Sequence, residues 1–557
     1  MRVLSAGEGY RYLLKSIAAG DTGRDLATSL TRYYSAAGTP PGVWVGNGLA
    51  GFDDPVLAEG EVVTEDQLRH LLGRGEHPTT GEQLGRAYFA FKPLKERVKI
   101  RTATLSERLN TEQREAEVEQ IAAEEKRRKR PRTVAGFDYT FSVPKSVSVL
   151  WAVSDGGTQA LIGQAHHAAI REVIDLLERD VAATRTGTNG VAQVDVRGVI
   201  ATAFDHFDSR AGDPQLHTHV VIANRVQAAD GKWRTLDGRP LHAAVVALSE
   251  HYNAVLADHL TRVLGVEWEA RERGRDRNPA WEITGVGAEL LGEFSSRTVA
   301  IETEKQRLIE EYVARHGKHP SETTVIRLRQ QATLATRPEK EVRSLADLTV
   351  EWRDRATRVL GEECTTWAMT LIESGTHVGV LRADDLPLEQ LGQIGEAVVA
   401  QVGVKRSTWR RWNLHAEASR QTMGLRFAST TDREAVIGMI VDAAEHASLT
   451  LTPPELVGPP AEFTRTDGSS MFRPKHHTVY SSTRILDAED TLLEVSRTTI
   501  APTVPLRIVG DVVSRPDDHG ITLSVEQQTA VEKIAASGRA IDLLVGPAGV
   551  GNTTCRV

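Results

Sequence analysis

Cysteine is nearly absent from this chain of 557 residues, which contains only Cys364 and Cys555. The two lie far apart and in no spacing typical of a metal or redox site, which excludes a disulfide framework and favours a reducing compartment. Long apolar runs are absent as well, because no stretch approaches the roughly 18 residues of a membrane helix. Residues 1–10 contain Glu8 and no apolar core, unlike a secretory signal. We therefore expect a cytoplasmic protein without membrane insertion.

Aromatic residues are also scarce, at 5%, whereas apolar residues make up 40% and charged residues 25% of the chain. The last two values are ordinary for soluble globular proteins, and the length favours three or four domains. A net charge of −8 argues against nucleic-acid binding over the whole surface. The basic run from Lys126 to Arg132 is as consistent with a solvated loop or helix end as with a DNA contact.

Hydrophobic patterning predicts several strands and a long helix before residue 230. Segments 194–204 and 216–226 have the β-branched, apolar character of buried strands, and the loop between them, 205–214, contains glycine and proline. The alternating segment 137–142 predicts a third strand, which a proline ends. A helix is expected over 157–183.

Three histidines lie where the two expected strands meet their loop. His217 and His219 are two residues apart on a strand, so their side chains point to the same face and can bind one metal ion. Antiparallel pairing would bring His206 beside them, giving three ligands and open positions, as in catalytic sites. The alternative is a pair of surface histidines with an unrelated neighbour. Asp138 is either the carboxylate that orients one ligand ring or an ordinary edge-strand aspartate.

The segments around these residues resemble known motifs. Ala203–Arg210 (AFDHFDSR) with Pro214–Asn224 (PQLHTHVVIAN) resembles the three-histidine motif of conjugative relaxases of the MobF class, the TrwC/TraI type within the HUH endonucleases. Gly136–Ser148 (GFDYTFSVPKSVS) resembles the second motif of that class, and the tyrosines near the N-terminus resemble the first. The three motifs occur in the family's order, and the resemblance covers roughly residues 1–300.

The resemblance implies an α+β fold with a central antiparallel sheet flanked by helices, followed by a mostly helical region. It implies metal-assisted transesterification by a tyrosine, which nicks and rejoins one DNA strand at a plasmid transfer origin through a 5′-phosphotyrosine link. The implied cofactor is a divalent ion, Mg²⁺ or Mn²⁺. The implied partners are single-stranded DNA at the transfer origin, relaxosome accessory proteins and a coupling protein.

The resemblance also assigns roles to residues. The implied metal ligands are His206, His217 and His219. Asp138 is implied as the partner that orients a ligand, and Tyr10, in a glycine-flanked segment, as the nucleophile. Further candidate tyrosines are Tyr12, Tyr33 and Tyr34, for each of which packing in an apolar patch is the alternative. The expected DNA contacts are Lys145 and Arg210.

The last residues resemble the start of the helicase module found in the same class. Leu523–Ala530 resembles a glutamine motif, and Gly546 opens the P-loop-like sequence GPAGVGNTT, which includes Gly551 and Thr553. Asn552 stands where a P-loop has lysine, so the charge that contacts the phosphates is missing. Together with the end of the chain at Val557, this predicts a truncated RecD-like module without ATPase or helicase activity.

The expected organisation has four parts: a relaxase domain (1–300), a helical connector (301–345), a mostly helical pre-helicase region (346–505) and the truncated helicase start (506–557). Arginines and lysines around Trp409 and Trp412 either bind single-stranded DNA or belong to a helix with buried tryptophans. Two alternative functions remain: a rolling-circle replication initiator or transposase of the same chemistry, and a non-catalytic DNA-binding remnant. The intact histidines argue against the remnant.

Overall fold

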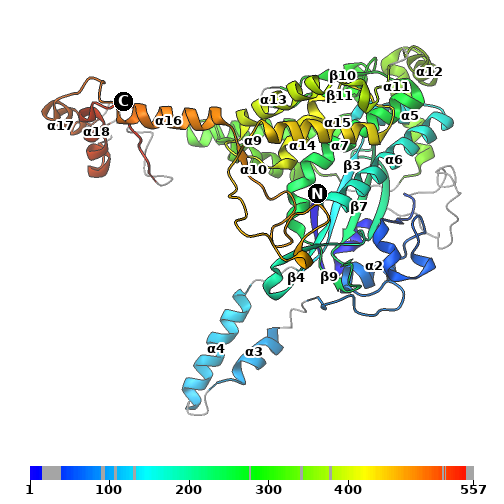
Figure 1. The fold of residues 1–557 in the computed structure, drawn as a ribbon, viewed down its shortest axis with the longest axis horizontal. Coiled ribbons are helices and arrows are strands. Elements are labelled where there is room, and N and C mark those ends of the chain that lie inside the picture. The colour runs from blue at the N-terminus through cyan, green and yellow to red at the C-terminus, as the bar shows by residue number, and fades with distance from the viewer. Residues whose placement is uncertain are drawn as a thin grey trace.

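A five-stranded antiparallel sheet forms the centre of the molecule, in the order β1-β3-β7-β6-β2 (Figure 1). The computed structural model describes residues 1–14, 39–88, 94–105, 110–128, 133–274, 277–338, 343–375, 379–516, 520 and 522–546. The strands of the sheet are β1 (Arg2–Ser5), β2 (Val43–Val45), β3 (Val134–Ser142), β6 (Ala201–Asp208) and β7 (Pro214–Ala223). This arrangement confirms the expected α+β class with a central antiparallel sheet.

Two apolar cores cover the two faces of the sheet. On β7, Val220 and Ile222 point into the larger core, beneath α5 (Lys145–Val153), α6 (Gly156–Asp180) and α7 (Gly238–Leu264). Val221 and Ala223 alternate with them and belong to the second core, formed with the N-terminal segment. The expected strand 137–142 and helix 157–183 are therefore present, as β3 and α6, with slightly different ends.

The β6–β7 hairpin is longer than its sequence predicts. β6 continues to Asp208, so the loop shrinks from the expected 205–214 to five residues, 209–213. The loop is closed by hydrogen bonds from Ser209 N to Asp213 O and from Gly212 N to Ser209 O. Gly212 has a φ of 77°, which glycine adopts without a steric cost. Ser209 and Gly212, which marked the expected loop, do lie in it, whereas residues 205–208 are strand residues whose side chains point alternately to the two faces.

The helical region after residue 300 packs directly on the sheet domain. Trp352 of α11 (Leu345–Leu360) and Trp412 of α14 (Arg411–Gln421) belong to the larger core. Asp258 of α7 forms a fully buried ion pair with Arg433 of α15 (Thr430–His446), with nitrogen–oxygen distances of 2.5 and 2.8 Å. The core is therefore continuous across the boundary expected at residue 300.

The remaining helices surround or extend from this body. They are α1 (Arg11–Leu14), α2 (Glu65–Leu68), α3 (Leu94–Thr102), α4 (Thr111–Arg127), α8 (Ala288–Glu293), α9 (Ser296–His316), α10 (Glu322–Ala335), α12 (Cys364–Glu373), α13 (Leu388–Lys405), α16 (Thr483–Arg497), α17 (Leu506–Val513) and α18 (Val525–Ser537). Figure 1 shows α3 and α4 as an arm below the body, and α16 leading to α17 and α18 at its far end. Within the described residues, no helix combines the length and apolar character needed to span a bilayer.

Short antiparallel ribbons complete the fold. They are β4 (Ala183–Thr186) with β5 (Ala192–Asp195), β8 (Val226–Gln227) with β9 (Trp233–Arg234), β10 (Trp268–Arg271) with β11 (Ala280–Ile283), and β12 (Leu449–Thr450) with β13 (Tyr480–Ser481). Basic residues Lys126 and Arg127 form the last turn of α4, which agrees with the helix-end interpretation of that run. Residues 129–132 lie outside the described part of the chain.

Candidate active site

The structure brings the three predicted metal ligands together on one face of the sheet. His206 on β6 pairs directly with His217 on β7, and His219 follows two residues later on the same face. One ligand nitrogen from each ring can be chosen so that all three lie within 4.8 Å of one another. The ring centroids are 5.1 to 5.5 Å apart. Three imidazoles converging on one point are a donor set that suits a divalent ion with open coordination positions.

Hydrogen bonds fix the orientation of two of these rings. Nδ1 of His219 donates to the carboxylate of Asp138, at 2.9 and 3.1 Å from its two oxygens. Nδ1 of His217 donates to the backbone oxygen of Gln215 at 2.8 Å. Both acceptors require a proton on Nδ1, so Nε2 of each ring carries the lone pair available for a metal ion. The carboxylate predicted to orient a ligand thus contacts His219.

Tyr12 is the tyrosine that reaches this cluster. It lies on α1, and its hydroxyl donates a hydrogen bond to Oδ2 of Asp138. Its ring meets the edge of His219 with centroids 6.2 Å apart, and the guanidinium of Arg2 lies 5.4 Å from its ring centroid. Burial and the neighbouring Asp138 charge raise the pKa of Tyr12 above its ordinary value, against the opposing effect of Arg2. The resting phenol therefore keeps its proton.

Tyr10, the expected nucleophile, points elsewhere. Its side chain is 1% exposed and packs in the second core with Leu13 and Leu71. Residues i and i+2 of a helical turn do not share a face, so a turn that presents Tyr12 to Asp138 turns Tyr10 inward. Burial of Tyr10 thus argues against the role expected for it. Tyr33 and Tyr34 lie outside the described residues.

The two expected DNA contacts differ in exposure. Lys145, at the start of α5, is largely buried, and its Nζ donates to the backbone oxygen of Pro214 at 2.8 Å. Burial lowers the pKa of Lys145 to about 8. This lysine fixes the first residue of β7, so its buried position does not support the expected contact with DNA. Arg210 is exposed at the tip of the β6–β7 loop, where a contact with DNA is sterically open.

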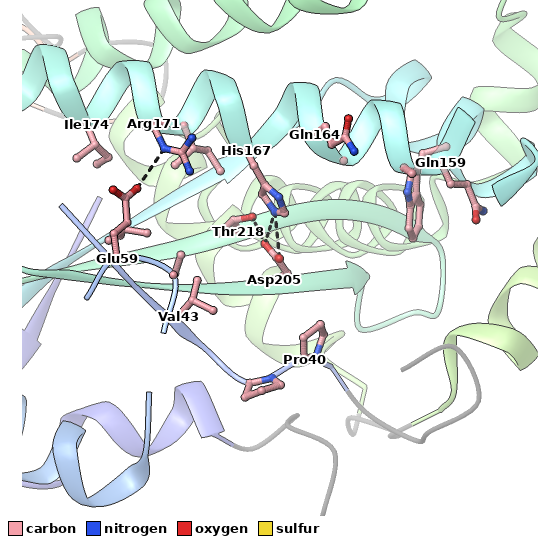
Figure 2. A pocket seen from close by; sticks show the side chains of 18 of the residues that line it. Pro40, Val43, Glu59, Gln159, Gln164, His167, Arg171, Ile174, Asp205 and Thr218 are labelled. Carbon is pink, nitrogen blue, oxygen red and sulfur yellow. Dashed lines mark hydrogen bonds and ion pairs between the residues drawn. The ribbon is translucent and has the colours of Figure 1, made fainter. Parts of the chain in front are cut away.

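A polar network that sequence inspection missed lies across the sheet from the histidines. The hydroxyl of Thr218 donates to Asp205, which also accepts from Nε2 of His167 at 3.0 Å, as Figure 2 shows. Thr218 in turn accepts from Nε2 of His166 at 2.8 Å. Burial alone would raise the pKa of Asp205. The charge and hydrogen bond of His167 outweigh this effect and hold that pKa well below its usual range. The alternation of side chains along a strand is the sequence signal that could have placed Asp205 and Thr218 on the face opposite the three histidines.

This network borders a cavity of about 730 Å³ between α6 and the β2 edge of the sheet. Figure 2 shows His167 and Arg171 of α6 on one side of the cavity and Val43 of β2 on the other, with Arg171 paired to Glu59. The lining mixes apolar surface with charges of both signs, which does not resemble a DNA-binding groove.

Two candidate sites lie in the C-terminal half: the region around Trp409 and Trp412, and the P-loop-like sequence. Trp409 and Trp412 are 1% and 7% exposed, and Arg411 pairs with Asp442 and Glu445. These contacts favour the helix with buried tryptophans over a stacking surface for DNA. Of the P-loop-like sequence, only Gly546 is described, because residues 547–557, with Gly551, Asn552 and Thr553, lie outside the described part.

Comparisons with known proteins agree with the motifs. The model of the TrwC relaxase family matches residues 6–359. Two multifunctional conjugation proteins TraI, from Escherichia coli and its strain K12, are 36% and 34% identical over 176 residues, which is 30% of this chain and 9% of each relative. The metal-bound structure of relaxase TrwC with oriT DNA aligns over 65% of this chain and 98% of that one, at 24% identity and a TM-score of 0.44. Because the family model covers more than half of its length, this chain belongs to the TrwC relaxase family, of the MobF class of conjugative relaxases.

Proposed function

We propose that this chain nicks one strand of DNA at a transfer origin, with Tyr12 as the nucleophile, and stays joined to the cut end. One observation carries the proposal: the hydroxyl of Tyr12 and Nδ1 of His219 share the carboxylate of Asp138, beside two further histidines. A nucleophile, a proton acceptor and a set of metal ligands therefore lie within a few ångströms of one another.

Asp138 accepts the phenol proton as the Tyr12 oxygen bonds to phosphorus. The bond from phosphorus to the 3′ oxygen breaks, and that oxygen takes up a proton from water. The products are a 5′-phosphotyrosine and a free 3′-hydroxyl. Because the phosphotyrosine ester keeps the bond energy, attack by a 3′-hydroxyl rejoins the strand without ATP.

His206, His217 and His219 are the residues that would hold a divalent ion, Mg²⁺ or Mn²⁺. Such an ion would polarise the scissile phosphate and stabilise the charge of the transition state. The chain itself orients the ligand rings for such an ion. Asp138 and the Gln215 carbonyl keep the protons of the His219 and His217 rings on Nδ1, so that Nε2 of each ring carries the free lone pair.

The substrate and partners follow from the family. The TraI proteins that this chain matches are conjugation proteins, although the chain spans only 9% of their length. We infer that single-stranded DNA at a plasmid transfer origin is the substrate, in the cytoplasm. Relaxosome accessory proteins and a coupling protein are the proposed partners. We also keep the proposed division into parts 1–300, 301–345, 346–505 and 506–557, with the addition that the second and third parts pack on the first.

A second proposal concerns ATP. Asn552 replaces the P-loop lysine, so we infer that the chain does not hydrolyse ATP or unwind DNA. The test is an ATPase assay of the purified chain with single-stranded DNA. DNA-stimulated hydrolysis would contradict the inference, and hydrolysis equal to the background without protein would support it.

The nicking proposal is tested on supercoiled plasmids that carry the cognate transfer origin. The expected result is open circles with protein on the 5′ end, dependent on added Mg²⁺ or Mn²⁺. Tyr12→Phe should abolish the product and Tyr10→Phe should not. Nicking in excess chelator would refute the metal role. Cleavage of a replication origin instead would favour an initiator, and binding without cleavage would favour a DNA-binding remnant.

A further inference from the structure

Three arginines from separate elements gather at the tip of the hairpin that carries the histidines. Arg210 lies in the β6–β7 loop, Arg297 in the first turn of α9, and Arg337 two residues after the end of α10. They are called the tip arginines below. Nothing in the motifs near Arg210 points to the other two, which lie about 90 and 130 positions further along the chain.

A chain of contacts holds α9 against the hairpin loop. The backbone N–H and hydroxyl of Ser296 donate to the carboxylate of Asp213, the last loop residue, at 2.9 and 3.1 Å. From α11, Arg355 pairs with the same carboxylate at 3.1 Å, and Nε1 of Trp352 donates to Gly212 O at 2.7 Å. The residue next to Ser296 is Arg297, so these bonds set Arg297 beside the loop that carries Arg210.

Arg297 in turn holds the end of α10. Its guanidinium donates to the backbone oxygens of Thr333 and Thr336, and to the Thr336 hydroxyl at 2.9 Å. Arg337 follows Thr336 directly. The tip arginines are therefore linked through hydrogen bonds of Arg297 and of their immediate neighbours, and the hairpin, α9 and α10 converge on one point.

The electrostatics of Arg210 agree with this convergence. Although Arg210 is exposed, partial desolvation lowers its pKa, and the positive charges of Arg337 and Arg297 lower that pKa further. Within the described part of the chain, neither Arg210 nor Arg337 forms an ion pair with a carboxylate. The two acidic side chains of the surrounding network, Asp213 and Glu293, are already bound to Arg355. Three like charges held together with no carboxylate partner among the described residues indicate a site for an anion.

The position of this site relates it to the histidines. His217 lies three residues from Pro214, where β7 leaves the loop, which corresponds to about 10 Å along a strand. Phosphates on one strand of a DNA duplex recur about every 3.4 Å along the axis. The tip arginines thus lie a few nucleotides from the proposed scissile phosphate.

We propose that Arg210, Arg297 and Arg337 bind backbone phosphates of the DNA strand on one side of the nick. This inference rests on the proposed function, because it names how the strand is held at that same site. Arg297 also fastens α10, so it positions the other two. Arg210 and Arg337 are exposed and supply the charge that the strand meets. Arginine suits this role, since its guanidinium fork matches phosphate oxygens.

The test measures binding without cleavage. The full chain, in excess chelator, is titrated against fluorescein-labelled oligothymidylate at several salt concentrations. Each phosphate contact to a single strand contributes about 0.7 to the slope of log affinity against log salt. The variant Arg210→Gln/Arg337→Gln should lower this slope by about 1.4. The matched control Arg315→Gln/Arg327→Gln removes two charges from exposed positions on α9 and α10 away from the tip, and should keep the wild-type slope.

An unchanged slope for Arg210→Gln/Arg337→Gln would overturn the inference, as would an equal loss in the control pair. Thermal unfolding checks that both variants fold, and Arg297 is left intact because it holds α10. The outcome is separable from the nicking proposal. If the double variant lowers the salt slope as expected but the wild-type chain never nicks DNA, only the proposed function is contradicted. If the wild-type chain nicks DNA but the double variant has the wild-type salt slope, only this inference is contradicted.

Discussion

Tyr12 and His219 contact the same carboxylate, that of Asp138, one through its hydroxyl and the other through Nδ1. Asp138 is 2% exposed, so the carboxylate that they share is itself buried. The sequence places the three residues in separate motifs, up to 207 positions apart. In the fold, β1 and β7 flank β3, and this order sets the proposed nucleophile and a proposed metal ligand on either side of one aspartate.

Replacing the shared carboxylate should weaken metal binding as well as cleavage. In Asp138→Asn the amide removes the negative charge that makes His219 a better ligand, so we expect metal affinity to fall about 10- to 100-fold. Calorimetric titration with Mn²⁺ measures the affinity. The control is Asp155→Asn, since Asp155 caps α6 and asparagine also caps well. Unchanged Mn²⁺ affinity in Asp138→Asn would show that the carboxylate does not act through His219.

Removal of one ligand should abolish the metal site while DNA binding persists. His217→Ala deletes one of three imidazoles, so we expect no measurable Mn²⁺ binding and a nicking rate lower by orders of magnitude. Oligonucleotide affinity should stay near that of the wild type, because phosphate contacts supply it. His446→Ala, at an exposed position on α15, is the control. If His217→Ala still bound one Mn²⁺ ion with wild-type affinity, the three-histidine site would be wrong.

The free energy of unfolding should depend strongly on the buried ion pair between Asp258 and Arg433. Asp258→Ala leaves a fully buried guanidinium without its partner, which costs about 3–5 kcal/mol of unfolding free energy. Asp442→Ala removes the exposed partner of Arg411 and should cost at most about 1 kcal/mol. Denaturant unfolding followed by tryptophan fluorescence compares the two. Equal losses would mean that α15 is not fastened to α7 by this pair.

Acid should destabilise the helical region after residue 300, which contains His415 and His476. Burial lowers the pKa of His415 to about 3 and that of His476 to about 4, helped by the nearby Arg411 charge. The unfolded chain, with histidine pKa values near 6.5, binds protons that the folded chain does not. The stability due to the neutral rings is therefore present above about pH 6.5 and is lost as the pH falls toward 4 and 3.

His415→Gln removes one of these titrations, so the melting temperature of the variant should depend less on pH below about 6.5 than that of the wild type. The exposed His446 gives the control His446→Gln, whose pH dependence should match the wild type. An acid dependence in His415→Gln as steep as in the wild type would rule out a contribution from this ring.

The sequence predicted that the three histidines would come together, because their geometry is local. The spacing of His217 and His219 determines their common face, and hairpin pairing adds His206. The sequence could not show that Tyr12 rather than Tyr10 reaches Asp138, because this depends on how a short helical turn packs against the second core. The buried position of Lys145 was hidden for a related reason: only the tertiary fold shows the carbonyl of Pro214 next to its ammonium group.

The sequence also did not show that residues beyond 300 contact the β6–β7 loop. Trp352 and Arg355 contact the β6–β7 loop through one hydrogen bond and one ion pair, 140 and 142 positions away in the chain. Neither contact leaves a periodic signal, since each depends on where α11 docks. The amphipathic pattern of α11 predicts that one of its faces is buried, and the fold shows that it packs beside the β6–β7 hairpin.

The identity of the covalently modified residue tests the central claim most directly. The chain is incubated with an oligonucleotide of the cognate origin, labelled on the 3′ side of the nick, and the adduct is digested and its peptide sequenced. The account predicts label on Tyr12, an adduct still formed by Tyr10→Phe, and none formed by Tyr12→Phe. Label on Tyr10, Tyr33 or Tyr34, with Tyr12→Phe fully active, would contradict it.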